Sequence, residues 1–329
     1  MYKRLLTIFV SILLMSCSHF EESKQNKRLN TVLNQFSNQK IAVVAPANSC
    51  NQECIKILNT FKEYHSNITF NIQANTDEEK AIALKKALLN EENDIIWIFR
   101  GGYGTANVVE LLYNDEEFLK QMKRKKKIPH VIGYCDVTAL HLFLSQEFGW
   151  KTIHGAMMKE ILNENKSIGN FCALNGIVNG IHKLEFVGLK PLNSAARNSK
   201  EISGKITGGN LSIIQTSIGT TWQIKTKNKI LFLEDWKEKP YKIARMLYHM
   251  KMSGLFNEVK AIVIGYMDHK NERIKQCIND FSKNISIPVY TMNVFGHGIY
   301  NYPIIYNSDG IITVKNNTIK LNINFECEK

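Results

Sequence analysis

Short apolar runs alternate with helix-like segments along the first half of the chain. Ile41–Ala45 ends at Pro46, Asp94–Phe99 precedes a glycine-rich turn, and His130–Gly133 precedes a helical pattern. Continuous apolar runs are typical of buried parallel strands, which need helical crossovers between them. The sequence therefore predicts an α/β fold in which helices cover both faces of a parallel sheet. In such folds ligands bind at the carboxyl ends of the strands.

The second half of the chain has a different pattern. Strands and helices alternate there and end in two runs, Ile311–Val314 and Ile319–Ile323, that are typical of an antiparallel pair. The chain has 329 residues, of which 44% are hydrophobic and 22% charged, and these are globular proportions for two domains. We therefore expect an N-terminal nucleophile domain at 41–165, a linker at 166–200 and a C-terminal domain at 201–329.

The first residues predict export. Residues 1–16 have a short basic start and an apolar run of signal-peptide length, and the LMSC sequence that ends at Cys17 resembles a bacterial lipoprotein processing site. The resemblance implies cleavage before Cys17 and its lipidation, so the mature chain is expected to be a membrane-anchored lipoprotein facing the periplasm or cell envelope. An ordinary secretory peptide is the alternative. Residues 17–40 are polar and suit a tether, or else contain a short docked helix around Leu29–Phe36.

Charge and cysteine spacing argue against two classes of function. Lysine and arginine outnumber the acidic residues by 42 to 30, which gives a formal charge of +12. Only 7 of the 42 are arginine, so the side chains that recognise phosphates and base edges are scarce and a nucleic-acid partner is disfavoured. The sequence contains no Cys-x-x-Cys pair, no Cys/His cluster with zinc spacing and no His-Glu-x-x-His motif. We therefore expect no metal.

Two turns between predicted strands and helices carry candidate chemistry. Cys135 lies in a Gly-Tyr-Cys-Asp turn that is similar to a nucleophile elbow, although a buried structural cysteine is the commoner role. Asp136 follows it and could also cap the next helix. The glycine-rich turn after Arg100 suits an oxyanion hole, in which the N–H groups of Gly102 and Asp136 are the donors. The alternative is a tight turn without a ligand.

Two further motifs supply a carboxylate and a base. Glu234 and Asp235 follow an apolar strand, where a carboxylate can orient a histidine, or can serve as a solvated acid or helix cap. His297 lies between two glycines, which predicts a loop instead of a packed helix and makes it the best general-base candidate. His154 is the second candidate, although a hydrogen bond to a strand end is its more ordinary role.

Together these motifs resemble the LD-carboxypeptidase family, which includes the murein tetrapeptide carboxypeptidases and is related to the microcin C immunity peptidases. The resemblance implies a Rossmann-like N-terminal domain, a β-rich α/β C-terminal domain, an active site between them and a homodimer. The family's catalytic Ser–Glu–His triad falls on Cys135, Glu234 and His297, and its oxyanion donors fall on Gly102 and Asp136. The matching segments, in chain order, are IAVVAPANS, FRGGYGTANVVELL, IGYCDVTALHLFL, TIHGAMM, GGNLSIIQTSIGT, ILFLEDWKEKPYKIARML and FGHG.

The implied reaction releases the terminal D-alanine of a muropeptide tetrapeptide by hydrolysing its bond to the L-centre of the diamino acid, without metal or organic cofactor. We assign substrate binding to Arg100, Tyr103 and Arg245. The chain departs from the family in having Cys135 where the family has serine, and in the residues that follow His297. Two alternatives therefore stay open: a non-catalytic peptidoglycan-binding lipoprotein and an immunity-type peptidase.

Overall fold

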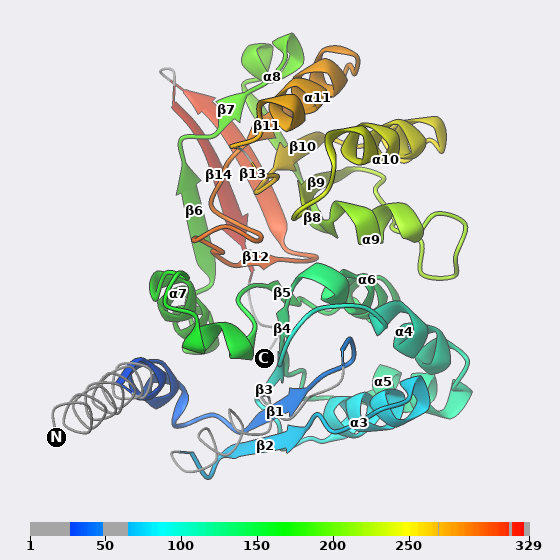
Figure 1. Ribbon diagram of the computed structural model, residues 1–329, viewed down its shortest axis with the longest axis vertical. Coiled ribbons are helices and arrows are strands. Elements are labelled where there is room, and N and C mark those ends of the chain that lie inside the picture. The colour runs from blue at the N-terminus through cyan, green and yellow to red at the C-terminus, as the bar shows by residue number, and fades with distance from the viewer. Residues whose placement is uncertain (1–26, 49–64, 269, 316–317, 326–329) are drawn as a thin grey trace, which may run out of the picture.

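The fold is described from a computed structural model (Figure 1). The predicted signal peptide and Cys17 lie outside the described residues, as do Cys50 and Cys54, two cysteines close enough in the sequence to form a disulfide. Within the part of the chain that the structure describes, no helix is long and apolar enough to cross a membrane. The described residues are 27–48, 65–268, 270–315 and 318–325.

The N-terminal domain is built on a sheet with strand order β12-β5-β4-β3-β1-β2. Its strands are parallel except β12, which reaches this sheet from the far end of the chain and pairs antiparallel with β5. The apolar runs of the sequence form its buried centre. The strands are β1 (Ile41–Val44), β2 (Ile68–Asn71), β3 (Ile95–Ile98), β4 (His130–Gly133), β5 (Ile153–His154) and β12 (Ile304–Ile305), and the helices are α3 (Asp77–Leu89), α4 (Thr105–Tyr113), α5 (Glu116–Arg124) and α6 (Thr138–Glu147), with 3₁₀ turns η1 (Asn34–Phe36), η2 (Cys135–Val137) and η3 (Met158–Leu162).

The C-terminal domain is built on an eight-stranded mixed sheet, in the order β6-β14-β13-β8-β9-β10-β11-β7. The four strands from β8 to β11 are parallel, and the outer pairings are antiparallel. The predicted two-domain α/β fold is thus confirmed. The strands are β6 (Lys183–Val187), β7 (Lys190–Pro191), β8 (Glu201–Asn210), β9 (Lys229–Glu234), β10 (Ala261–Ile264), β11 (Val289–Thr291), β13 (Asp309–Lys315) and β14 (Thr318–Asn324), and the helices are α7 (Gly169–Val178), α8 (Ser194–Asn198), α9 (Leu211–Thr216), α10 (Pro240–Met252) and α11 (Glu272–Lys283).

The prediction that residues 166–200 form a linker is wrong. This segment contains two helices, α7 and α8, and two strands, β6 and β7, that form the two edges of the C-terminal sheet. The side chains of β6 are exposed or half-buried along its whole length, as is usual for an edge strand. Leu184 and Phe186 alternate with polar residues in β6, but this alternation covers only Lys183–Phe186 and is too short to have revealed the strand.

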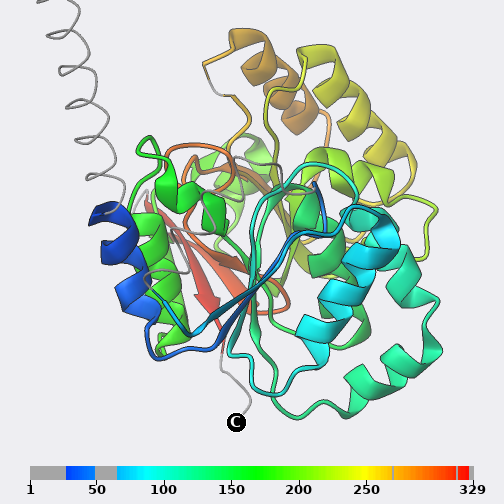
Figure 2. The ribbon, with the colours of Figure 1, turned by 60° about the horizontal axis from the view of Figure 1, so that its bottom comes forward.

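The expected tether at 17–40 is also wrong from residue 27 onward. Residues 27–33 are helical and continue into η1, as the docked-helix alternative proposed. The apolar side chains of this helix face the domain, and Figure 2 shows it lying beside α7, across the sheet from α3. The ring of Phe36 lies 5.0 Å from the ring of Trp97 on β3. The buried side chains are Leu29, Val32, Leu33 and Phe36.

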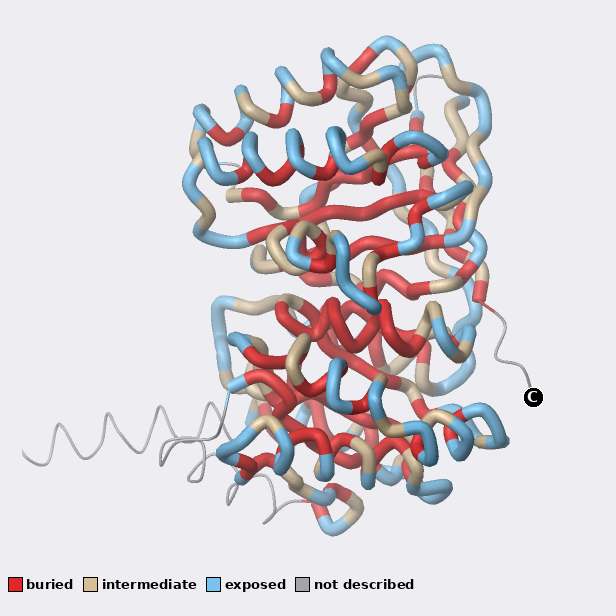
Figure 3. Tube along the Cα trace, turned by 90° about the vertical axis from the view of Figure 1, so that its right-hand side faces the viewer, coloured by how far each residue is buried: buried red, intermediate tan, exposed pale blue. Residues whose placement is uncertain are grey.

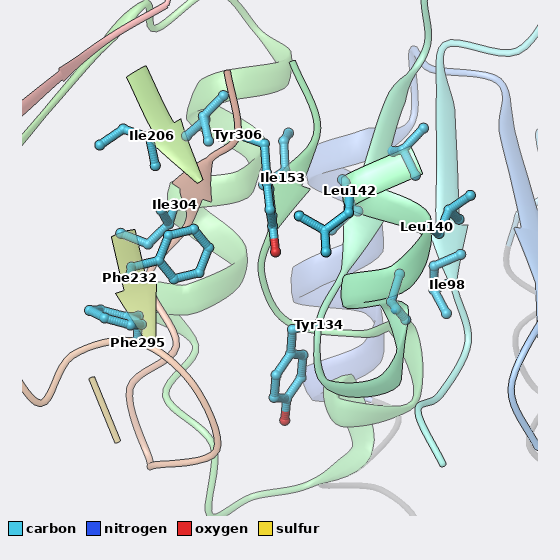
Figure 4. Packing of buried hydrophobic residues seen from close by; sticks show 14 of the residues in the cluster. Ile98, Tyr134, Leu140, Leu142, Ile153, Ile206, Phe232, Phe295, Ile304 and Tyr306 are labelled. Carbon is cyan, nitrogen blue, oxygen red and sulfur yellow. The ribbon is translucent and has the colours of Figure 1, made fainter. Parts of the chain in front are cut away.

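The two domains share a continuous apolar core. Buried residues, red in Figure 3, occur in both halves, and Figure 4 shows part of the packing in detail. Tyr306, which follows β12, lies between the sheets and donates a hydrogen bond to the carbonyl of Gly208 at 2.8 Å. Gly208 has no room for a side chain, because a Cβ there would lie 1.9 Å from the carbonyl oxygen of Phe232. A shared core of this kind holds the carboxyl ends of β4 and β9 at a fixed separation.

The docked N-terminal helix generates a stability prediction. Replacing the buried Leu33 by alanine removes packed methyl groups and leaves a cavity, so unfolding by urea should require about 2–5 kcal/mol less free energy. Thr31→Ala, on the exposed face of the same helix, is the matched control and should change stability by less than about 0.5 kcal/mol. Equal, small effects of both substitutions would mean that the segment is a loose tether.

Candidate active site

The predicted nucleophile elbow is present at the carboxyl end of β4. Cys135 begins the 3₁₀ turn η2 and has a φ of +65°, a left-handed conformation that costs a non-glycine residue about 1–2 kcal/mol. Gly133, two residues earlier, allows the close turn, since a Cβ there would lie 2.9 Å from a side-chain carbon of Ile98. The strained turn projects the half-buried thiol from the edge of the sheet.

The glycine-rich turn lies beside Cys135. A Cβ on Gly101 would lie 3.3 Å from the Cys135 sulfur, so the absence of a side chain lets this turn approach the thiol. Gly102 has a φ of +139° and packs on Asn48, whose Oδ1 accepts a hydrogen bond from the Tyr103 N–H at 3.2 Å. These contacts fix the position of the turn. Asn48 is a site residue whose role the sequence analysis missed.

Asp136 does not cap the next helix, α6, as the sequence analysis gave as its alternative; it caps the earlier helix α4. Its buried Oδ2 accepts a hydrogen bond from the N–H of Thr105, the first residue of α4, at 2.8 Å. This bond ties the glycine-rich turn to the elbow. Burial raises the pKa of the Asp136 carboxyl, and the hydrogen bond from Thr105 partly offsets that rise. The side chain serves the scaffold, while the backbone N–H stays the candidate oxyanion donor.

The carboxylate and the histidine come from the C-terminal domain and meet. Glu234 is the last residue of β9 and is fully buried, and its Oε2 lies 2.6 Å from Nδ1 of His297. Asn210 donates a second hydrogen bond to this carboxylate, at 3.3 Å. Gly296 makes the approach possible, because a Cβ there would lie 2.6 Å from Oε2. Glu234 therefore holds the imidazole by Nδ1, and Cys135 interacts with the same side chain closely enough to raise its pKa.

Electrostatics define the protonation of the pair. Burial by itself lowers the pKa of His297, but the charge of Glu234 and the hydrogen bond to Cys135 raise it to about 10. Burial raises the pKa of Glu234, yet the charge of His297 holds it below its usual value. At neutral pH the two groups therefore form an ion pair. Burial lowers the pKa of His154 to about 4, so this second candidate is neutral and lies enclosed behind the site, on β5.

Asp235 differs from Glu234 in its surroundings. It is buried, and its carboxylate accepts hydrogen bonds from the hydroxyl of Ser212 at 2.7 Å and from Asn210 at 3.1 Å. Burial and the neighbouring charge of Glu234 raise the pKa of its carboxyl group. The two adjacent acids are therefore neither solvated nor equivalent: Glu234 orients the histidine, and Asp235 fastens the start of α9.

Aromatic rings surround the imidazole at the edge of a cavity of about 980 Å³. The indole of Trp236 stacks on His297 with 5.4 Å between ring centroids and 4° between planes, and the Tyr134 ring lies 4.8 Å away. Trp236 is 47% exposed, so it forms part of the cavity rim. In the sequence, the position of Trp236 directly after Glu234 and Asp235 did not indicate that it borders a cavity. Cys135 and Gly102 line the same cavity.

The three predicted substrate-binding residues lie in different places. Arg100 lines the cavity. Tyr103 is 74% exposed and does not line it, although its backbone N–H anchors the glycine-rich turn. The prediction that Arg245 binds substrate is wrong. This residue lies on the exposed face of α10, where its guanidinium lies 5.4 Å from the centre of the Tyr241 ring. Helical spacing places Arg245 opposite the buried side of α10, away from the strand ends.

Within the described ranges, no group of three or more His, Cys, Asp or Glu side chains is arranged to hold a metal ion.

Comparisons with known proteins identify the family. The LD-carboxypeptidase N-terminal domain family matches residues 41–155, and the LD-carboxypeptidase C-terminal domain family matches residues 203–311. A candidate carboxypeptidase of Rickettsia conorii is 40% identical over 295 residues, which is 87% of this chain and 91% of that protein. The murein tetrapeptide carboxypeptidase of Pseudomonas aeruginosa is 22% identical and covers 83% of this chain and 92% of its own length.

Solved structures share the fold. The crystal structure of muramoyltetrapeptide carboxypeptidase from Oxalobacter formigenes matches with a TM-score of 0.70 at 22% identity, over 86% of this chain and 98% of that one. An MccF-like protein from Streptococcus pneumoniae, in complex with AMP, matches with a TM-score of 0.71 at 18% identity, over 88% and 99%. Both domain families match in the expected order, and the resemblance drawn from the motifs is confirmed: the chain belongs to the LD-carboxypeptidase family.

Proposed function

We propose that this protein is an LD-carboxypeptidase that removes the terminal D-alanine from muropeptide tetrapeptides, with Cys135 as its nucleophile. The observation that carries the proposal is the convergence of Cys135, His297 and Glu234 from two domains at one cavity, with the imidazole bonded to the carboxylate at 2.6 Å. Family membership supports the hydrolase activity. The named relatives among murein peptidases support the substrate class.

Acylation begins with attack of the Cys135 thiolate on the carbonyl carbon that precedes D-alanine. The oxyanion that forms is stabilised by the N–H groups of Gly102 and Asp136. The C–N bond then breaks as protonated His297 donates its Nε2 proton to the leaving nitrogen, which releases D-alanine as its free amine. The remaining acyl group is held on sulfur as a thioester, and Glu234 keeps the ring oriented throughout.

Deacylation uses the same histidine as a base. Loss of the thiolate on acylation removes one of the charges that raise the pKa of His297, so the neutral imidazole becomes more accessible. Water adds to the thioester carbon, its proton passes to Nε2, and the sulfur leaves as a thiolate. The shortened peptide is released as a carboxylate, and the original ion pair is restored.

The surroundings of Cys135 suit a cysteine nucleophile, so the absence of the family's serine does not by itself make the site inactive. A hydroxyl nucleophile needs a neutral base beside it, whereas a thiol attacks as its thiolate and is compatible with a protonated histidine. The pKa of about 10 at His297 provides that protonated partner at neutral pH. The carboxylate, the glycine-rich turn and the strained elbow are all retained with the cysteine, which supports turnover over a purely peptidoglycan-binding role.

An immunity-type peptidase is the second candidate, supported by the fold shared with the MccF-like protein that was solved with AMP. The exposed indole of Trp236 at the cavity rim could stack on a purine as well as on a peptide. The two candidates differ in the leaving group. Purified protein given a disaccharide tetrapeptide and a peptidyl-adenylate analogue in parallel will distinguish them, because our account predicts faster cleavage of the tetrapeptide.

We further propose that the chain is exported and anchored through lipidated Cys17, facing the periplasm or cell envelope. The apolar run and the LMSC sequence support this assignment. Residues 18–26 then remain between the lipid and the docked helix, and nine residues span at most about 30 Å. The catalytic body would therefore stay close to the membrane surface. The homodimer implied by the family resemblance is likewise a proposal, to be measured as mass in solution by light scattering.

Substitution of the nucleophile tests the proposed activity. With disaccharide tetrapeptide as substrate, Cys135→Ala should lower D-alanine release by at least about a thousandfold, because it removes the attacking atom. Cys135→Ser should retain a fraction of the wild-type rate. If correctly folded wild type binds the muropeptide between pH 5 and 9 but releases no D-alanine, the protein is a binding protein and the proposed hydrolase is wrong.

The charge of His297 can be measured directly. Proton NMR of the wild type should show His297 titrating near pH 10, and Cys135→Ala should lower its pKa towards the ordinary value by removing the hydrogen bond and charge of the sulfur. His154, which is buried away from the thiol, is the internal control and should stay neutral above about pH 4 in both proteins. A His297 that titrates near 6.5 in the wild type would contradict the ion pair.

Lipidation is tested by labelling. Bacteria that express the full chain and are fed labelled palmitate should incorporate it into the wild type, and Cys17→Ala should abolish the label. Cys172→Ala is the control, since Cys172 is an exposed cysteine of the folded domain. Secretion of unlabelled wild type into the soluble envelope fraction would favour an ordinary signal peptide.

A further inference from the structure

Lys166 connects the two halves of the active site. It lies in the former linker, between η3 and α7, and its side chain is only 11% exposed. Its ammonium group donates to the carbonyl oxygens of His297, at 3.2 Å, and Gly298, at 2.9 Å. It also lies 2.9 Å from Oε1 of Glu160 and 3.4 Å from the hydroxyl of Tyr134, the residue before the nucleophile. One amine thus joins the histidine loop to the nucleophile domain.

We propose that Lys166 is a positioning residue that holds the His297 loop in register with Cys135. The proposal rests on the proposed hydrolytic function of the site. An ammonium group has three protons, and four acceptors surround this one, so its donors are occupied by the protein. Lys166 therefore acts on the reaction through the backbone of the loop, although its side chain borders the cavity.

The segment that follows Lys166 continues the same cradle. The Ser167 N–H donates to the carbonyl of Ile299 at 3.0 Å. Buried Asn170 donates to that same carbonyl at 3.2 Å and accepts a hydrogen bond from the Asn301 N–H at 2.9 Å. Every bond in this set joins the segment 166–170 to the loop 297–301. Lys166 is the member of this set that is charged and that also contacts the nucleophile domain, so it sets the separation between the two.

The cradle is itself held from the other side by the docked N-terminal helix. Arg28 donates to the carbonyl of Lys166 at 2.7 Å and to the carbonyl of Ile161 at 2.6 Å. Its guanidinium also lies 6.0 Å from the centre of the Phe171 ring. The backbone that presents Lys166 is therefore fixed on both sides, and the side chain has a defined direction towards the histidine loop.

Loss of Lys166 is expected to change the position of the His297 ring more than the affinity for substrate. If the loop loses its anchor, Nε2 of His297 moves relative to the sulfur, and a displacement of about 1 Å can cost about a hundredfold in rate. Most residues that line the cavity lie outside this loop, so binding of the peptide is expected to change less than the rate. Removing Lys166 is therefore expected to lower kcat and leave KM nearly unchanged.

Lys166→Met tests the proposal, with D-alanine release from disaccharide tetrapeptide as the activity. We expect kcat to fall about 30-fold and KM to change less than about threefold. Lys159→Met is the matched control: Lys159 borders the same cavity, and none of its side-chain hydrogen bonds among the described residues reaches the histidine loop. It removes the same charge, so KM should change more than kcat.

A second readout does not depend on turnover. The Nδ1 proton of His297, bonded to Glu234 at 2.6 Å, should give a downfield NMR resonance that is identified by its loss in His297→Ala. Its exchange with water should accelerate at least about tenfold in Lys166→Met and stay unchanged in Lys159→Met. If the wild type proves inactive, this readout still tests the positioning role, and failure of the proposed function is thereby separated from failure of this inference.

Other results would overturn the inference. A Lys166→Met protein with raised KM, unchanged kcat and unchanged proton exchange would make Lys166 a substrate ligand. If Lys166→Met does not fold, Lys166→Gln, which keeps a donor for one carbonyl and lacks the charge, is measured in its place and should show a kcat loss of about tenfold with faster exchange. Unchanged values in Lys166→Gln would contradict the positioning role.

Discussion

The contact between His297 and Glu234 is the interaction on which the site depends. A fully buried carboxylate is expensive unless a charge and hydrogen bonds compensate it, and the imidazolium 2.6 Å away supplies both. The need to compensate this buried carboxylate also constrains the fold around it. Gly296 must lack a side chain for the ring to approach, and Asn210 must end β8 beside β9 to donate the remaining hydrogen bond. The catalytic geometry is therefore a consequence of the packing of the C-terminal sheet.

The proposed nucleophile, Cys135, is held by a separate set of contacts in the other domain. Cys135 is strained at a positive φ, which a chain tolerates only where its surroundings fix the conformation. The close approach of Gly133 to β3 and the cap of Asp136 on α4 fix it here. Neither domain carries a complete site, so activity depends on the shared core around Tyr306 and on the cradle at 166–170, which sets the distance between thiol and imidazole.

The sequence predicted the parts of the structure that have strong local signals. Buried strands are continuous apolar runs, and the turns that contain Gly102 and Cys135 follow strand ends, where parallel sheets place ligands. It could not show that Glu234 and His297 meet, because 62 residues separate them in the chain and their contact depends on strand order. The motif resemblance supplied that pairing before the structure did.

The predictions that were wrong concern segments and residues with little local sequence signal. The alternating pattern of the edge strands at 183–191 is short, and the helix at 27–36 is short and contains many polar residues. Arg245 was chosen for its charge, and charge alone does not reveal which face of a helix points at a cavity. No sequence motif marks Lys166, because its role consists of hydrogen bonds to backbone carbonyls that lie far away in the sequence.

The most direct measurement of the central claim is the rate at which iodoacetamide alkylates each cysteine at pH 6, read by peptide mass spectrometry. A cysteine that acts as the nucleophile beside protonated His297 should be modified faster than the exposed Cys172 of the same molecule. His297→Ala should remove that advantage. The account predicts faster modification of Cys135 in the wild type only, and it is contradicted if Cys172 reacts faster or if His297→Ala leaves the rate at Cys135 unchanged.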